Sequence, residues 1–114
     1  MTRALPLFKG TLDLLILKAL SVEPMHGYGL SVWLERGSEG EICVEDSAIY
    51  QALRRLEGGR LVDAEWGQTS NNRRARFYRL TAAGRRHLRD EAQTWLRYVR
   101  WVGVLLEAGD GVPA

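Results

Sequence analysis

The first segment with a regular apolar pattern is residues 11–22, where hydrophobic residues stand at positions 12, 15, 16, 19 and 20. That spacing is typical of one face of an α-helix. Leu14 and Leu17 add a second apolar side, so we expect this helix to be buried on more than one face. Thr11 is a suitable N-cap residue, and Pro24 ends the helix.

A second helix is predicted from about His26 to Arg36, with residues 28 or 29, 32, 33 and 36 at successive turns and Gly37 at its end. Its first residues, His26-Gly27-Tyr28-Gly29, match neither a P-loop nor a dinucleotide-binding fingerprint. Glycines 27 and 29 are better explained by close packing of this helix against its neighbours. A loop follows, in which residues 42–44 could form a short strand.

The third predicted helix begins at Asp46 or Ser47, which are both good N-cap residues, and it ends before Gly58-Gly59. Its expected buried stripe consists of Ala48, Ile49, Ala52, Leu53 and Leu56. Its opposite face presents Ser47, Tyr50, Gln51, Arg54 and Arg55.

Two short strands are predicted next, over residues 60–66 and 75–80. The first alternates imperfectly, with apolar residues at positions 61, 64 and 66. The second alternates better, with Phe77 and Arg79 on one face and Arg76, Tyr78 and Leu80 on the other. Turn-forming residues fill positions 67–72 between them, so the pair predicts a β-hairpin with a polar tip.

The last predicted helix runs from Thr81 to about Ala108, and its apolar residues recur at alternating spacings of four and three. These residues are Leu88, Ala92, Trp95, Val99, Val102 and Leu106. The spacing is that of a coiled-coil seam, although it lasts for fewer than three heptads. Leu96, Trp101 and Leu105 widen the apolar surface beyond that seam, so we expect the helix to form a homodimer.

This order of elements predicts a mainly α fold with a small β-hairpin, namely a winged helix-turn-helix followed by one long helix. Residues 1–81 would form the DNA-binding domain, residues 82–108 the C-terminal dimerisation helix, and residues 109–114 a flexible tail. A chain of 114 residues is long enough for one such domain and its modest core.

Charge is distributed unevenly along the chain. Between Arg54 and Arg89 there are ten arginines and three acidic residues, a local charge of +7, whereas the formal net charge of the whole chain is +2. The rest of the chain therefore sums to −5. A segregated basic block on a nearly neutral protein is typical of a protein that binds nucleic acid.

Other functional classes receive little support from the composition. One cysteine and two histidines provide neither a disulfide framework nor a zinc-ligand cluster. We find no nucleophile–base pair and no carboxylate pair, so we expect neither an enzyme nor a bound cofactor or metal. No apolar run is long enough to span a bilayer, and no signal peptide is evident, so a cytoplasmic location is expected. Cys43 is expected to be a small buried or half-buried hydrophobe.

The exposed face of the third helix is the first candidate DNA-binding surface. The hydroxyl groups of Ser47 and Tyr50 could hold phosphates, while Gln51 and Arg54 could reach adenine and guanine edges. Arg55 could contact a phosphate or pair with a nearby acid. The alternative is that Tyr50 is a half-buried core aromatic and that the other residues form a solvated face.

The hairpin is the second candidate surface. Asn72, Arg73, Arg74 and Arg76 gather at or beside its tip, where they could lie along phosphates or enter the minor groove. Exposed strand arginines can also serve only solubility or edge protection. The hydroxyl group of Tyr28, at the start of the second helix, could contact a further phosphate.

Several motifs resemble the PadR family of bacterial transcriptional regulators. They are Gly10-Thr11-Leu12-Asp13 with Ile16-Leu17 and Ala19-Leu20, His26-Gly27-Tyr28, Ile49-Tyr50 with residues 53–57, and residues 76–84 (RFYRLTAAG). Together they span roughly residues 8–90. The chain departs from the family at Gln51, where proline is common, so the start of the recognition helix could be shaped differently here.

The resemblance, which is to the short subclass with a single C-terminal helix, implies a dimeric repressor that binds an inverted-repeat operator and is released by a small molecule or another signal. It also suggests that Trp95 and Trp101 of two subunits could line a cavity for a planar aromatic effector, although placement in the dimer core is the simpler reading of both residues. We therefore predict a sequence-specific double-stranded DNA-binding transcriptional regulator. The alternative is a winged-helix protein–protein interaction module without specific DNA binding.

Overall fold

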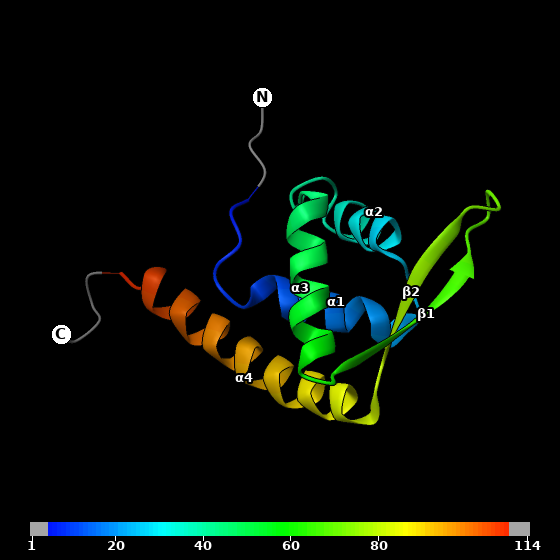
Figure 1. Ribbon diagram of the computed structural model, residues 1–114. Helices are drawn as coiled ribbons and strands as arrows, with labels where there is room; N and C mark the ends of the chain where they lie inside the picture. Colours follow the sequence, from blue (N-terminus) through cyan, green and yellow to red (C-terminus); the bar gives the residue numbers. More distant parts are fainter. Residues whose placement is uncertain (1–4, 110–114) are drawn as a thin grey trace.

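The computed structural model describes residues 5–109, which form four helices and one antiparallel two-stranded sheet (Figure 1). The elements are α1 (Thr11–Val22), α2 (Gly27–Gly37), α3 (Asp46–Gly58), β1 (Val62–Gln68), β2 (Arg74–Leu80) and α4 (Ala82–Leu106). This architecture confirms the predicted fold class, a winged helix-turn-helix with a long C-terminal helix. Apart from Gly109, the predicted tail lies outside the described residues.

Two of the predicted helix caps are wrong. At α1 the N-cap is Gly10, whose φ of 88° is left-handed, while Thr11 lies inside the helix with a buried hydroxyl that has no hydrogen-bond partner. At α3 the extended residue Glu45 is the N-cap and its side chain makes no capping hydrogen bond. Asp46 and Ser47 therefore lie in the first turn, where the carboxylate of Asp46 complements the helix dipole.

The hairpin begins later than predicted because Arg60, which follows the end of α3, adopts a left-handed turn conformation with φ 61°. The register runs from Val62 opposite Leu80 to Gln68 opposite Arg74. On the outer edge of β2, the segment between α1 and α2 makes an isolated antiparallel bridge through Met25 and Tyr78. Their backbone groups exchange two hydrogen bonds of 3.1 and 2.8 Å, which tie the start of α2 to the wing.

The core lies between α1, α2, α3 and the base of the hairpin. Its buried residues are Ile16, Leu17, Ala19, Leu20, Met25, Leu30, Leu34, Ile49, Ala52, Leu53, Leu56, Val62, Tyr78 and Leu80. The predicted stripe of α3 is confirmed, with Ala48 half-buried at its margin. In α2 the buried residues are Gly27, Leu30 and Leu34, whereas Tyr28 is 70% exposed. The buried stripe of α2 therefore lies beside the residues that the sequence places at successive turns, 28 or 29, 32, 33 and 36.

Residues 42–44 do not form the strand that the sequence suggested. Among the described residues this segment pairs with no other strand, and the N–H group of Ile42 instead donates to the Ser38 hydroxyl at 2.8 Å. Ile42 and Val44 pack against the core, so Cys43 between them is exposed. The expectation of a buried or half-buried Cys43 is therefore also wrong.

Helix α4 begins at the predicted position, where the Thr81 side chain accepts a hydrogen bond of 2.9 Å from the N–H group of Gly84. The helix then passes across the body of the molecule and extends beyond it (Figure 1). Its exposed apolar residues are Leu96, Tyr98, Val99, Trp101, Val102, Val104, Leu105 and Leu106. Leu88, Ala92 and Trp95 are half-buried. No helix in residues 5–109 combines the length and apolarity that a membrane crossing requires.

Candidate nucleic-acid interface

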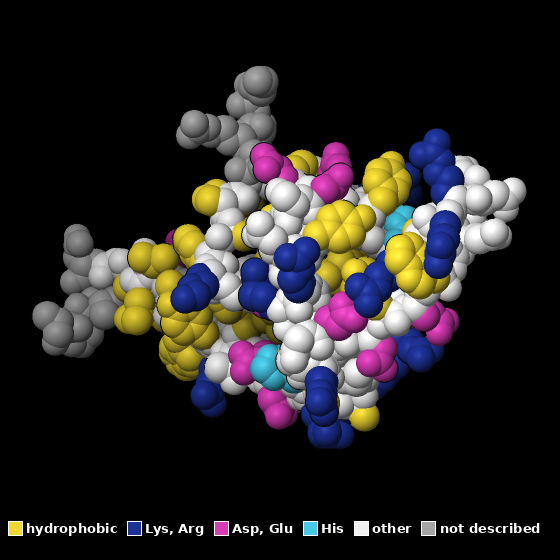
Figure 2. All heavy atoms as spheres, in the orientation of Figure 1, with side chains coloured by type: hydrophobic (Ala, Val, Ile, Leu, Met, Phe, Trp, Pro, Cys, Tyr) yellow, Lys and Arg dark blue, Asp and Glu magenta, His cyan; other side chains and the backbone are white. Residues whose placement is uncertain are grey.

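The outer face of α3 is unobstructed and carries the predicted polar residues. Ser47, Tyr50, Gln51, Arg54 and Arg55 are all exposed, and Tyr50 keeps 49% of its surface open. The buried stripe on the other side holds the helix against the core, so these side chains have a fixed base from which to reach outward. In Figure 2 lysine and arginine side chains gather over this helix and along the hairpin.

The start of α2 positions Tyr50. A Cβ atom at Gly27 would lie 2.6 Å from the Tyr50 Cζ and Oη atoms, so the phenol ring rests directly on the glycine. The prediction that Gly27 permits close packing is confirmed. At Gly29 the nearest atom would be 3.5 Å away, an ordinary contact, so the same explanation is not needed there.

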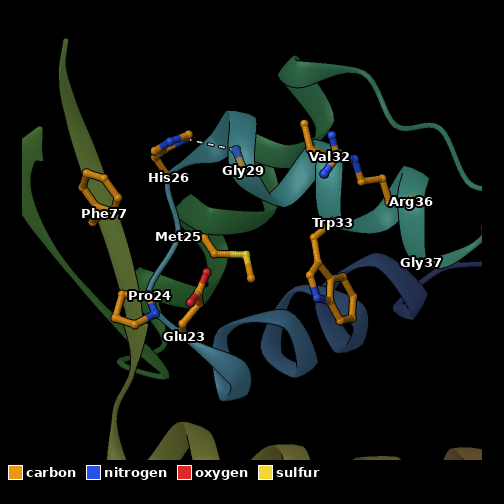
Figure 3. A pocket seen from close by; sticks show the side chains of 10 residues that line it. All are labelled: Glu23, Pro24, Met25, His26, Gly29, Val32, Trp33, Arg36, Gly37 and Phe77. Carbon is orange, nitrogen blue, oxygen red and sulfur yellow. Dashed lines mark hydrogen bonds between the residues drawn. The ribbon is translucent and has the colours of Figure 1, made fainter. Parts of the chain in front are cut away.

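His26 caps α2 and links it to the wing. Its Nδ1 atom accepts a hydrogen bond of 3.0 Å from the N–H group of Gly29, and its ring lies edge-on to Phe77 of β2 at 5.1 Å between centroids (Figure 3). A second ring, Tyr28, stacks at 6.3 Å. Figure 3 shows His26, Gly29 and Phe77 among the residues that line a cavity, which Met25 and Trp33 also line. The volume of this cavity is about 500 Å³.

Strand alternation segregates charge between the two faces of the hairpin. The face that contributes Val62, Tyr78 and Leu80 to the core continues outward as Trp66, Arg76 and Arg74, because residues two apart in a strand share a face. Asp63 and Glu65 alternate with these residues and lie on the other face, opposite Arg79 and Phe77. The face turned toward the helices is therefore the basic one.

The tip of the hairpin is organised by Thr69. Its hydroxyl accepts hydrogen bonds from the N–H groups of Asn71 and Arg73 at 3.3 and 3.2 Å, and its carbonyl accepts one from Asn72 at 2.9 Å. Asn72 adopts a left-handed conformation with φ 60°, which asparagine tolerates well. Asn72, Arg73 and Arg74 remain exposed beside this turn.

Two of the candidate arginines already have acidic partners. Arg55 bonds Asp13 of α1 at 2.7 Å, and this hydrogen bond and charge raise the pKa of Arg55. Of the two roles considered for Arg55, pairing with a nearby acid is the one found. Arg76 bonds Glu57 at the end of α3 at 2.8 Å. Both pairs are exposed, so each guanidinium can exchange its carboxylate for another anion at modest cost.

A cleft of about 970 Å³ separates the helices from the wing. Its walls include Tyr28 and Tyr50 on the helical side and Trp66, Arg73, Arg74 and Arg76 on the wing. The structure thus brings together residues from three predicted surfaces. Gln51 and Arg54 stand on α3 outside the lining of this cleft, on the exposed face of the helix.

Trp66 is the cleft residue that sequence reasoning missed. The sequence pattern marks it only as an alternating apolar position of a strand, yet it is 59% exposed and the Arg74 guanidinium lies 4.4 Å from its ring centroid. The available signal was the alternation of Ala64 and Trp66 with Asp63 and Glu65, which separates the aromatic residue from the acids.

The two tryptophans suggested for an effector site occupy different surroundings. Trp95 is half-buried, lies 6.0 Å from Tyr98 and lines a cavity of about 530 Å³ between α1 and α4. Trp101 is 54% exposed, does not line that cavity, and has the Arg100 guanidinium 5.5 Å from its ring. Within residues 5–109 no group of three or more metal-ligating side chains converges.

Comparison with known proteins agrees with this geometry. The model of the transcriptional regulator PadR-like family matches residues 16–90. A PadR-family transcriptional regulator from Eggerthella lenta is 35% identical, with 89% of this chain and 86% of that chain covered and a TM-score of 0.73. A PadR-like transcriptional regulator from Bacillus cereus is 28% identical, with coverages of 89% and 96% and a TM-score of 0.76.

A third structure, of a Streptococcus mutans protein, is 21% identical and shows the shared fold over 98% of this chain and 99% of its own, with a TM-score of 0.80. The family model covers well over half of the chain and includes α2, α3 and the hairpin. The chain therefore belongs to the PadR-like family of transcriptional regulators, whose winged-helix fold is a DNA-binding fold.

Proposed function

We propose that this regulator binds double-stranded DNA sequence-specifically as a homodimer and represses transcription from an inverted-repeat operator. The observation that carries the proposal is the exposed face of α3 beside a wing whose basic side is turned toward it. In this arrangement a helix enters the major groove while the wing follows the adjoining backbone.

Base reading is assigned to the exposed middle of α3. Gln51 and Arg54 are both exposed and neither makes a hydrogen bond or ion pair to another side chain among the described residues, so both are available to base edges. Glutamine can pair with adenine and arginine with guanine in the major groove. Ser47, Tyr50 and Tyr28 would hold phosphates through their hydroxyl groups.

Affinity is assigned to the wing. Asn72, Arg73 and Arg74 would contact the backbone, and Arg76 and Arg55 would join them by exchanging their carboxylate partners for phosphate. Each such contact releases counterions, so the dissociation constant should rise steeply with salt.

Dimerisation is assigned to α4, and the division at residue 81 separates the proposed DNA-binding domain from this helix. The seam residues Val99, Val102 and Leu106 are exposed in one chain, as is the neighbouring Trp101. Covering such a surface with a second copy would remove it from water and place two α3 helices for half-sites about 34–36 Å apart. Release by a small molecule would act through this interface, with Trp95 of the seam and the neighbouring Trp101 as the proposed aromatic contacts.

The test is to select genomic fragments with the purified protein and to titrate salt against the selected fragment and a random duplex. Arg54→Ala should cost on the order of 1–3 kcal/mol on the selected fragment and relax the preference at one base pair, whereas Arg74→Ala should weaken both duplexes alike. If both variants lose equally on both duplexes, Arg54 does not read bases. If the wild-type protein selects nothing, the interaction-module alternative is favoured.

A further inference from the structure

Trp66 is a large aromatic side chain that its own fold leaves uncovered. It lies on β1 with 59% of its surface exposed, on the face of the hairpin that is turned toward the cleft. The neighbouring acids Asp63 and Glu65 lie on the opposite face. Packing within the chain does not account for an indole at this position, because the apolar base of the same face is already filled by Val62 and Tyr78.

Arg74 is stacked on this indole. Trp66 stands directly opposite Arg76 in the register, so Arg74 is its diagonal neighbour on the same face, and the guanidinium lies 4.4 Å from the ring centroid. Arg76 is bound to Glu57, whereas Arg74 makes no ion pair within residues 5–109. The stack therefore holds an unneutralised cation in a defined place on the strand.

The opposite wall of the cleft is also aromatic. Tyr28 and Tyr50 are 70% and 49% exposed and face the wing across a space of about 970 Å³. The lining therefore includes apolar surfaces, which are the two phenol rings and the indole, and anion-binding groups, which are the two hydroxyl groups and the guanidinium. A nucleic-acid strand presents the matching groups, because its backbone repeats an apolar sugar ring and an anionic phosphate.

We propose that Trp66 and Arg74 form one seat for the backbone of a DNA strand. The indole contacts a deoxyribose ring, and the guanidinium stacked on it binds the adjacent phosphate. Trp66 is thereby a positioning residue for Arg74 as well as a contact in its own right. The seat acts on any sequence, since it touches no base edge, and it rests on the DNA binding proposed above.

The experiment measures binding of the full chain to a selected operator fragment and to a random duplex of equal length over a range of salt concentrations. Trp66→Ala should weaken both duplexes by roughly three- to ten-fold. It should lower the salt dependence by less than the loss of Arg74 does, because the charge of Arg74 remains but is no longer held in place. Arg74→Ala should lower the slope of log affinity against log salt by about one. The double variant should lose less than the sum of the two losses, because the two residues act together.

Two further measurements separate contact from mere structural support. Trp66→Phe keeps an aromatic surface and should recover most of the affinity. DNA should quench part of the tryptophan emission of the wild-type protein, and this quenching should disappear in Trp66→Phe. It should persist in the control Trp33→Phe, because the Trp33 indole lines the separate cavity of about 500 Å³. Thermal unfolding should be nearly the same for all variants, since Trp66 is exposed.

Wild-type affinity of Trp66→Ala at every salt concentration would overturn the proposal, and so would a loss confined to the operator fragment. Quenching that persists in Trp66→Phe would overturn the sugar contact. If the wild-type protein bound neither duplex, DNA binding itself would be refuted. That result differs from failure of the Trp66 proposal, in which the wild-type protein binds and Trp66→Ala binds equally well.

Discussion

Replacing Gly27 with alanine should impair DNA binding while leaving the fold nearly intact. The added Cβ atom would lie 2.6 Å from Tyr50 Cζ and Oη and 2.9 Å from Cε1. Carbon atoms in ordinary contact are separated by about 3.5–4.0 Å, so the phenol ring must move by roughly 1 Å. The ring can swing outward because it is 49% exposed.

The energetic consequences differ for folding and for binding. Alanine is favoured over glycine in a helix by about 0.5–1 kcal/mol, which offsets the cost of displacing an exposed ring, so we expect stability to change by less than about 1 kcal/mol. DNA binding is affected because the Tyr50 hydroxyl is moved away from the position in which it would contact a phosphate. A phosphate hydrogen bond of ordinary net strength is worth about 1–2 kcal/mol, so affinity should fall roughly five- to thirty-fold.

The assay pairs urea unfolding with DNA titration at fixed salt, and Gly29→Ala is the matched control. That position lies on the same helix, and its added Cβ would come no nearer than 3.5 Å to another atom, so binding should be unchanged. Tyr50→Phe should show a similar loss, and combining it with Gly27→Ala should add little. Normal binding by Gly27→Ala would refute the role of Tyr50, and a loss of several kcal/mol in stability would show that the ring is part of the core.

Three further outcomes are expected. Gly84→Ala would place a Cβ 2.0 Å from the Leu61 carbonyl oxygen, so its free energy of unfolding in urea should fall by about 1–3 kcal/mol or more. The control Gly103→Ala, whose Cβ would meet nothing within 4 Å, should be neutral or stabilising. Equal stability of the two variants would contradict this packing. Asp13→Asn removes the acidic partner of Arg55, so the free energy of unfolding should fall by less than about 1 kcal/mol. DNA affinity should rise and depend more steeply on salt, because Arg55 is then free to bind a phosphate. A weaker affinity would argue against a phosphate contact by Arg55. Val99→Glu should give a monomer by light scattering and Arg97→Glu, off the seam, should not; a dimer of Val99→Glu would remove the seam from the interface.

Local pattern was sufficient for the elements and for much of the core. The stripe Ile49, Ala52, Leu53 and Leu56 follows from a periodicity that any helix must obey, and the hairpin follows from turn-forming residues between two alternating runs. The basic character of the region from Arg54 onward is likewise a property of the sequence alone. Boundaries were less well predicted, because Gly10 and Glu45 cap their helices through backbone conformation without a side-chain hydrogen bond.

The tertiary structure decided which side chains pair with one another. Arg55 and Asp13 are 42 residues apart and Arg76 and Glu57 are 19 apart, so their pairing depends on the angles at which α1, α3 and the wing pack. The same packing rests Tyr50 on Gly27 and turns Trp66 and Arg74 toward the cleft. Periodicity indicates which face of a helix or strand is apolar, but it does not indicate which other element that face packs against. The sequence by itself therefore determined that an amphipathic helix and a basic hairpin exist, and only the packing of the helices and the wing decided which of their side chains are left without a partner inside the chain.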